Sequence, residues 1–127
     1  MTDEDWARVC GHIRSALDIR ARKRGGSATH TLEQVLVGVR EGRFQLWAGE
    51  ACAIVTEIVS YPLCRDLNYW LAGGSIAEMK ALEPGIEAWA RARGCTLTTT
   101  LGVRRAGGRI LKACGYRHQA DVMTKEL

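Results

Sequence analysis

Hydrophobic residues recur at steps of three and four along the start of the chain, which predicts an amphipathic helix. The helix is expected from Asp3 to about Arg22, because Thr2 can cap its start and Gly25-Gly26 can stop it. Its apolar stripe consists of Trp6, Val9, Cys10, Ile13 and Leu17.

A second helical stripe follows, made of Leu32, Val35, Leu36 and Val39. Thr31 and Gln34 match a capping box, in which each residue bonds the backbone N–H of the other. We therefore expect a helix that begins after Thr31 and ends at Gly42.

The hydrophobic period then changes to two, which is typical of strands. We expect strands at Phe44–Trp47, Cys52–Ser60 and Arg65–Ala72, and their short connections predict an antiparallel meander. The third strand alternates, with Leu67, Tyr69 and Leu71 on one face and Asp66, Asn68 and Trp70 on the other.

The central helix is expected from Ser75 towards Arg93. Ser75 and Glu78 match another capping box, with the Glu78 carboxylate predicted to bond the N–H of Ser75. Pro84 should kink or split this helix, because proline cannot donate to the preceding turn.

Three further elements complete the predicted order. Cys95–Leu101 is expected as a strand parallel to the one before the central helix, because a strand-helix-strand unit makes a crossover. A short helix over Arg105–Cys114 and a closing strand over Tyr116–Lys125 follow. The sequence therefore predicts one α/β (α+β) domain over residues 1–127, in the order α-α-β-β-β-α-β-α-β.

Composition and charge narrow the class of protein. The chain is 46% hydrophobic and 25% charged, as in ordinary globular proteins, and no apolar run is long enough to span a membrane. The acidic start at Thr2–Asp5 does not resemble a secretory signal, so synthesis inside a cell is expected. The five cysteines show no metal-ligand spacing, and we expect no metal site.

Much of the net charge of +4 lies in one run that contains Arg20, Arg22, Lys23 and Arg24. This run is a candidate surface for nucleic acid or for an acidic protein. The alternative is a solvated helix end, whose cations interact favourably with the helix dipole.

Several phrases resemble the GNAT (Gcn5-related N-acetyltransferase) family. The run Ile110–Tyr116, in which a helix ends in glycine followed by an aromatic residue, is similar to the late signature of that family. The phrases QLWAGE, AIVTEIVSYP, NYWLAGGSIAEM and EAWARARGC resemble small GNAT-like proteins encoded in bacteriophage and prophage genomes. The resemblance implies a mixed sheet, with an antiparallel meander and one parallel pair of strands splayed around the central helix.

In the family, acetyl-CoA lies between the two parallel strands, with its pyrophosphate on a glycine-rich loop before the central helix. Here the resemblance assigns that role to Leu71, Gly73, Gly74, Ser75, Ile76 and Ala77. The sequence departs from the family pattern, since only Gly73-Gly74 separates the strand from Ser75. The first cation afterwards is Lys80, and the Glu78 carboxylate would repel a phosphate. A basic, glycine-rich stretch over Gly102–Arg109 could bind phosphate as a substitute for this loop, or bind nucleic acid. The alternative is a turn whose arginines are solvated.

Catalysis in the family requires a base and an acid. Glu57 is the first candidate base and Asp66 the second, with Asn68 as a polar residue of the cleft. A glutamate paired with an arginine across the sheet is the alternative for Glu57. The acid position, four residues before Gly115, holds Leu111, which has no proton to give.

Two hypotheses of function follow. The first is a non-catalytic interaction protein of phage or prophage origin that binds other phage or virion proteins, in the host cytoplasm and in the virion. The second is an acetyl-CoA-dependent N-acetyltransferase with a diverged pyrophosphate loop. The first hypothesis requires no cofactor, whereas the second requires acetyl-CoA.

Overall fold

The computed structural model of the chain describes residues 2–101 and 105–127. Its elements are α1 (Asp3–Lys23), α2 (Leu32–Arg40), β1 (Gln45–Ala48), β2 (Cys52–Ser60), β3 (Arg65–Gly74), α3 (Ile76–Ala92), β4 (Leu97–Thr100) and α4 (Arg105–Ala113). In the described residues, no helix is long and apolar enough to cross a membrane.

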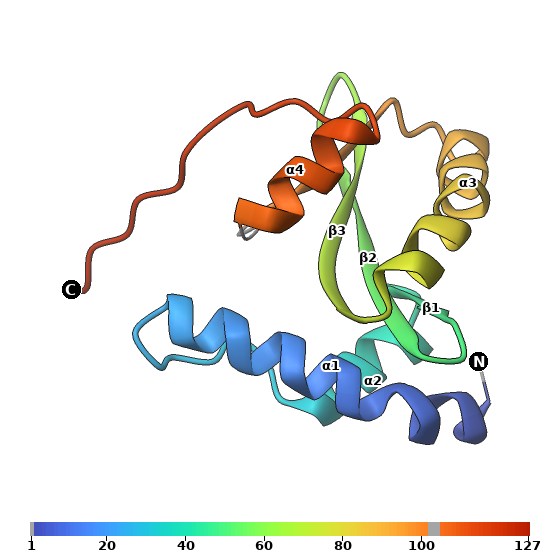
Figure 1. The fold of residues 1–127 in the computed structure, drawn as a ribbon, viewed down its shortest axis with the longest axis vertical. Coiled ribbons are helices and arrows are strands. Elements are labelled where there is room, and N and C mark those ends of the chain that lie inside the picture. Colours follow the sequence, from blue (N-terminus) through green and yellow to red (C-terminus); the bar gives the residue numbers. More distant parts are fainter. Residues whose placement is uncertain (1, 102–104) are drawn as a thin grey trace.

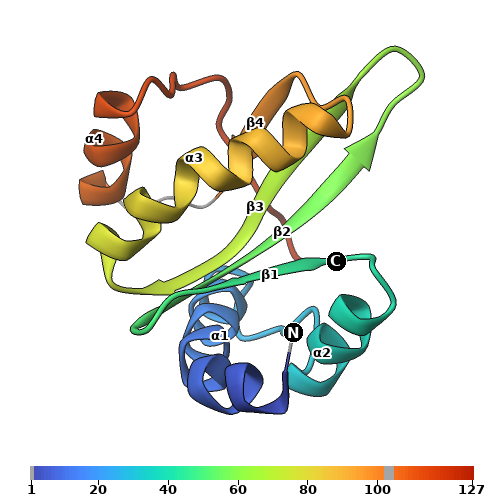
Figure 2. The same cartoon turned by 90° about the vertical axis from the view of Figure 1, so that its right-hand side faces the viewer.

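The four strands form one mixed sheet in the order β1-β2-β3-β4. β1, β2 and β3 are antiparallel neighbours, and β4 lies parallel to β3. Figures 1 and 2 show α1 and α2 on one face of the sheet and α3 on the other. The predicted meander and parallel pair are confirmed.

Each face of the sheet carries its own hydrophobic core. Against α1 and α2 the buried residues are Val9, Ile13, Ala16, Leu17, Val35, Phe44, Ala53, Val55 and Leu71. Against α3 they are Ile54, Leu67, Ile86, Ala90 and Cys95. The alternation of β2 explains this division, since Ala53 and Val55 face α1 while Ile54 faces α3.

The predicted alternation of β3 is wrong at one point, because the strand contains a bulge. Val55 lies opposite Leu71 and Thr56 lies opposite Tyr69, so Trp70 is an extra residue with no partner of its own. The extra residue reverses the faces that follow it. Leu67 and Tyr69 therefore pack against α3, whereas Leu71 packs against α1.

The predicted closing strand over Tyr116–Lys125 is also wrong, since these residues carry no regular secondary structure. Tyr116 touches β4 through its side chain, where its hydroxyl accepts from the Thr98 hydroxyl at 3.0 Å. Val122 and Met123 are exposed, so the segment buries little that would hold it against its own sheet. β4 is thus the last strand of the sheet among the described residues.

Pro84 does not split the central helix, because α3 runs through it from Ile76 to Ala92. Pro84 itself is exposed, while Ile86 and Ala90 in the following turns are buried against the sheet. Packing of the following turns compensates for the hydrogen bond that proline cannot donate.

Candidate functional site

β3 and β4 separate next to the start of α3, where the resemblance places a cofactor. The two strands pair from Asp66 opposite Leu97 to Tyr69 opposite Thr100. β3 then continues to Gly74 with β2 alone as its partner among the described residues. Among residues 2–101 and 105–127, the backbone of β3 beyond Tyr69 therefore has an unpaired edge towards β4, beside the N-terminus of α3.

The connection between β3 and α3 is shorter than the predicted two-glycine bridge. Gly73 and Gly74 still pair with β2, and Ser75 is already the N-cap of α3. The Ser75 N–H donates to the Ala51 carbonyl at 2.8 Å, and the Glu78 N–H donates to the Ser75 hydroxyl at 3.3 Å. A helix start offers four N–H groups, so only those of Ile76 and Ala77 have no partner among the described residues.

The two glycines are required by packing within the chain. A Cβ on Gly73 would lie 2.7 Å from the carbonyl oxygen of His12, on α1. Gly74 has φ +98°, and a Cβ there would overlap the carbonyl oxygen of Ala51. Close approach of other backbone segments accounts for both glycines without any ligand.

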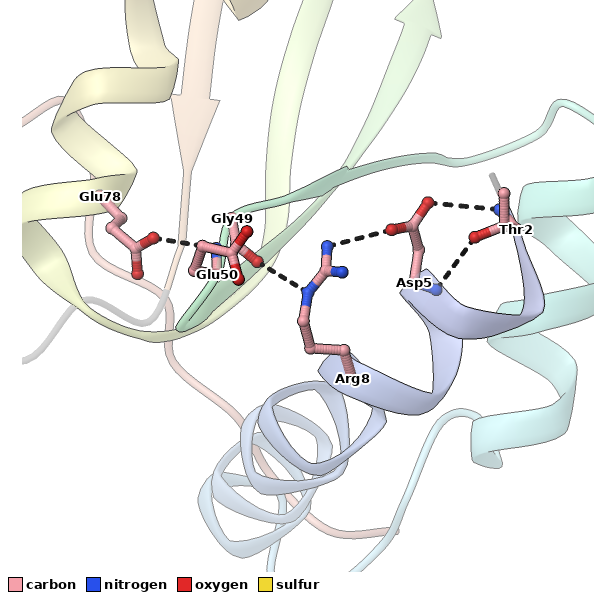
Figure 3. A network of polar contacts seen from close by, with 6 residues as sticks. All are labelled: Thr2, Asp5, Arg8, Gly49, Glu50 and Glu78. Carbon is pink, nitrogen blue, oxygen red and sulfur yellow. Dashed lines mark hydrogen bonds and ion pairs between the residues drawn. The ribbon is translucent and has the colours of Figure 1, made fainter.

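The Glu78 carboxylate does not complete the predicted capping box. It accepts instead from the N–H groups of Glu50 at 2.9 Å and Ala51 at 2.8 Å, in the turn between β1 and β2. Figure 3 shows the bond to Glu50. The Ser75 N–H is unavailable to Glu78, because it already donates to Ala51. A carboxylate of the chain itself thus lies beside the first turn of α3, held by charge-assisted bonds.

The same turn is held from its other side by α1. Arg8 donates from Nε to the Gly49 carbonyl at 3.3 Å and forms an ion pair with Asp5 at 3.0 Å (Figure 3). Asp5 also accepts from the N–H of Thr2, the cap of α1. Hydrogen bonds from Thr2 and the charge of Arg8 lower the pKa of Asp5. The network joins the starts of α1 and α3 through the turn.

We expect Glu78→Gln to lower the free energy of unfolding by about 1 to 2 kcal/mol. Glutamine offers one acceptor oxygen and no charge, so one of the two turn N–H groups loses its partner. Urea unfolding measures the change. Glu50→Gln is the matched control, since it removes an exposed carboxylate but keeps the bonded N–H, and should change little.

The candidate base and the candidate cleft residue lie side by side. Glu57 on β2 is opposite Asn68 on β3, and Asn68 is opposite Thr99 on β4. The Asn68 side-chain oxygen accepts from the Thr99 hydroxyl at 3.2 Å, and all three residues are half-buried. Glu57 follows Ala53 and Val55 in alternation, which puts this row on the face of α1 and α2. Among the described residues, Glu57 forms no ion pair, so its predicted alternative pairing with an arginine is not observed.

Two phenols to which the sequence assigned no catalytic role, those of Tyr69 and Tyr116, lie on the opposite face. The Tyr69 hydroxyl is buried and has no hydrogen-bond partner in the described part of the chain. Burial raises the pKa of both Tyr69 and Tyr116, and the nearby Glu83 and Glu87 raise it further. A raised pKa makes each phenol a poorer proton donor. Leu111 on α4 is half-buried and apolar.

Burial, followed by the charge of Glu87, raises the pKa of Glu83 on α3. The folded chain therefore holds the Glu83 proton more tightly than the unfolded chain does. The protonated Glu83 side chain stabilises the folded chain fully at pH values below its ordinary pKa. This stabilisation is lost as the pH rises through the raised pKa. We expect Glu83→Gln to stabilise the protein at pH 7 by at most about 1 kcal/mol, because solvent screens this half-buried group. In thermal unfolding near pH 4, Glu83→Gln should not stabilise the protein. The control Glu50→Gln should not stabilise it at pH 4 or at pH 7.

The cations of the basic run at the end of α1 differ in burial and in contacts. Arg20 is half-buried and donates to the Leu101 carbonyl at 3.3 Å, and burial lowers its pKa. Arg24 donates to the Ser27 carbonyl at 3.3 Å, and Arg22 and Lys23 are exposed. In the glycine-rich stretch predicted as a substitute phosphate site, residues 102–104 lie outside the described residues.

Solved structures of other proteins share this architecture. A tetramutant of the BH1408 protein from Bacillus halodurans has a TM-score of 0.73 at 16% identity, over 100% of this chain and 97% of that one. An acetyltransferase from Trypanosoma brucei has a TM-score of 0.59 at 12% identity, over 93% and 94%. An aminoglycoside acetyltransferase from an uncultured soil metagenomic sample, in complex with sisomicin, has a TM-score of 0.64 at 8% identity, over 100% and 93%. The chain has the GNAT fold.

No family model matches this sequence, and no curated protein matches it. Structural likeness at such low identities shows the GNAT fold alone, and one fold can carry many functions. The function of this GNAT-fold chain must therefore be argued from its own residues.

Proposed function

We propose that this chain is a non-catalytic GNAT-fold interaction protein of phage or prophage origin and a structural component of a virion. The non-catalytic part rests on one observation, which is that N–H groups at the start of α3 are already bonded within the chain. Two of its four N–H groups bond Ala51 and Ser75 within the chain. The phage origin is supported by the resemblance of four phrases to phage and prophage proteins, namely QLWAGE, AIVTEIVSYP, NYWLAGGSIAEM and EAWARARGC.

A bound pyrophosphate would meet an unfavourable environment at this helix start. An anion site needs several convergent N–H groups, and here the described residues leave only those of Ile76 and Ala77. The Glu78 carboxylate adds a like charge in the same turn. Lys80, the nearest cation that follows, is exposed and therefore screened by water.

The described residues also offer only weak candidates for the proton donor that acetyl transfer requires. Leu111 stands at the position where the family resemblance places the acid, and the two nearby phenols have raised pKa values. Transfer from acetyl-CoA needs a proton for the leaving thiolate, and such groups supply it poorly.

A role in assembly is supported by exposed apolar side chains at the tip of the β2–β3 hairpin. Tyr61 is more than half exposed and Leu63 is 98% exposed. The hairpin extends beyond the helices at the top of Figure 1. Aromatic and aliphatic side chains on a projecting loop are suited to anchoring another protein.

A coenzyme titration tests the non-catalytic part of the proposal. Coenzyme A at about 1 mM should leave the melting temperature unchanged, whereas a dissociation constant of about 10 μM would stabilise the protein by roughly 2.7 kcal/mol. A rise that grows with coenzyme concentration would refute the proposal. Mass spectrometry of phage particles, purified from the organism whose genome encodes this chain, tests the virion part of the proposal. Absence of the chain from those particles would refute that part.

The alternative function is an acetyl-CoA-dependent N-acetyltransferase with a diverged pyrophosphate loop. It is favoured by the separation of β3 from β4 and by the row formed by Glu57, Asn68 and Thr99. In this case Glu57→Gln should lower the rate of acetyl transfer to amines by about 100-fold, as for loss of a general base. Glu33→Gln, at an exposed residue in the first turn of α2, should leave that rate unchanged.

A further inference from the structure

β1 is the first strand of the sheet, and its outer edge is open. Among the described residues β1 pairs only with β2. The Gly49 N–H donates to the Cys52 carbonyl at 3.0 Å, which continues this ladder beyond Ala48. Hydrogen-bonded pairs recur at every second residue of an antiparallel ladder. The backbone N–H and C=O groups of Leu46 and Ala48 therefore point away from β2, and no described residue bonds them there.

A groove of about 390 Å³ lies beside this edge. Its lining includes Val39 at the end of α2, Phe44, Leu46 and Trp47 along β1, and Trp89 on α3. Figure 2 shows β1 at the margin of the sheet, with α2 below it and α3 above it. The rings of Trp47 and Trp89 lie 5.5 Å apart between centroids, and Trp47 Nε1 donates to the Thr56 hydroxyl at 3.0 Å. The aromatic wall of the groove is therefore held in place before any partner arrives.

The two faces of β1 divide the side chains of the groove into two sets. Leu46 packs with the core of α1 and α2, whereas Trp47 packs with the core of α3. Side chains of directly opposite residues in neighbouring strands project to the same face. In a strand added beside β1, the residue opposite Trp47 would reach Trp89, and its two neighbours would reach Val39 and Phe44. The groove therefore fits an extended segment with three successive apolar residues.

The α3 side of the groove carries positive charge. The Arg93 guanidinium lies over the Trp89 ring, with its Cζ 3.9 Å from the ring centroid. Arg65 donates to the Arg93 carbonyl at 3.1 Å. Within the described residues, neither Arg93 nor Arg65 forms an ion pair with a carboxylate. Acidic side chains next to the apolar residues of a bound segment would complement this charge.

We propose that β1 binds an extended segment of another protein, which adds to the sheet as a strand and carries an apolar anchor flanked by acidic residues. The anchor lies against Trp47 and Trp89, and the acidic residues face Arg93. The outward backbone groups of Leu46 and Ala48 supply the hydrogen bonds. This proposal names the kind of partner for the proposed interaction function and rests on that function. Its test uses neither coenzyme nor phage particles, so its failure is distinguishable from failure of the non-catalytic or virion part.

Fluorescence anisotropy of a labelled synthetic peptide, Asp-Glu-Val-Leu-Val-Glu-Asp, tests the docking on the full chain. We expect saturable binding with a dissociation constant below about 100 μM. Replacing the central leucine of the peptide with serine should weaken binding about tenfold or more, because the buried anchor is lost. Methylation of the backbone nitrogen of both valines should weaken it by about as much, because a methylated nitrogen cannot donate to the edge of β1.

Variants of the chain test the same contacts from the other side. Arg93→Gln should weaken binding of the acidic peptide about threefold at low salt, since an exposed charge pair is lost. Arg91→Gln is the matched control, because Arg91 is an exposed arginine of the same helix that pairs with Glu87 beside a different cavity. Ala48→Pro should weaken binding about fivefold or more, because proline removes an outward donor. That donor has no partner within the described residues, so the melting temperature should change little.

Absence of saturable binding at about 1 mM peptide would overturn the proposal. Unweakened binding of the methylated peptide would also overturn it, since the segment would then be held by side chains without joining the sheet. An oligothymidine of about 12 nucleotides that binds more tightly than the peptide would assign the arginines and tryptophans to single-stranded nucleic acid, against the proposal.

Discussion

Gly74→Ala should lower the free energy of unfolding by about 3 kcal/mol. Gly74 has φ +98°, a conformation that costs a residue with a Cβ roughly 1 to 2 kcal/mol. The new methyl group would also overlap the Ala51 carbonyl, and such overpacking costs about 1 to 3 kcal/mol. The strain falls on the bond by which Ser75 donates to Ala51, so the start of α3 should loosen as well.

Urea unfolding followed by circular dichroism measures this loss. Gly11→Ala is the matched control, because Gly11 lies within α1 and a Cβ there would have nothing within 4 Å. That control should stabilise the protein by up to about 1 kcal/mol, since alanine favours a helix over glycine. An unchanged midpoint for Gly74→Ala would mean that Gly74 is not held against β2, and that a looser loop precedes α3.

The sequence predicted best those features that depend on neighbouring residues. Thr2 caps α1 and Thr31 caps α2, and in both cases the residue three positions later completes the capping box. Within the described part of the chain, no group outside these segments competes for the same N–H groups. A local pattern was therefore enough to place both helix starts.

The third capping box shows where local reasoning fails. Ser75 bonds the Glu78 N–H as predicted, but the Glu78 carboxylate binds the β1–β2 turn. The competing acceptor for the Ser75 N–H is Ala51, which is distant in the sequence and adjacent only after folding. The most informative feature of the candidate site was thus invisible in the local pattern.

The bulge in β3 and the missing last strand have a similar cause. Strict alternation assumes that every residue of β3 has one partner, and Trp70 has none. The tail has a strand pattern but buries too little against its own sheet to form a ladder. Both outcomes depend on contacts between residues that are distant in the sequence, and the local pattern does not reveal these contacts.

The separation of β3 from β4 and the division of the sheet into two cores are linked through this bulge. Tyr69 ends the pairing of β3 with β4, and the next residue, Trp70, is the extra one. Beyond it, β3 turns its buried side chains towards α1 and leaves the face of α3. β3 and β4 therefore separate beside the start of α3, where Ser75 bonds Ala51 and Glu78 bonds the β1–β2 turn.

Leu71→Ala should lower the free energy of unfolding by about 3 kcal/mol, because Leu71 is fully buried and its removal leaves a cavity. The bulge predicts which core that cavity belongs to. In a double-mutant cycle, Leu71→Ala and Ile13→Val on α1 should show a coupling energy of at least about 0.5 kcal/mol, because both residues lie in one cluster. Paired with Ile86→Val on α3, it should be additive within roughly 0.5 kcal/mol.

Chemical denaturation of the single and double variants gives both coupling energies. Leu63→Ala, at a side chain that is 98% exposed, should cost almost nothing and shows that the loss comes from burial. Coupling to Ile86 instead of Ile13 would put Leu71 on the face of Leu67 and Tyr69, as strict alternation predicts. β3 would then be regular, and no bulge would mark the point where it separates from β4.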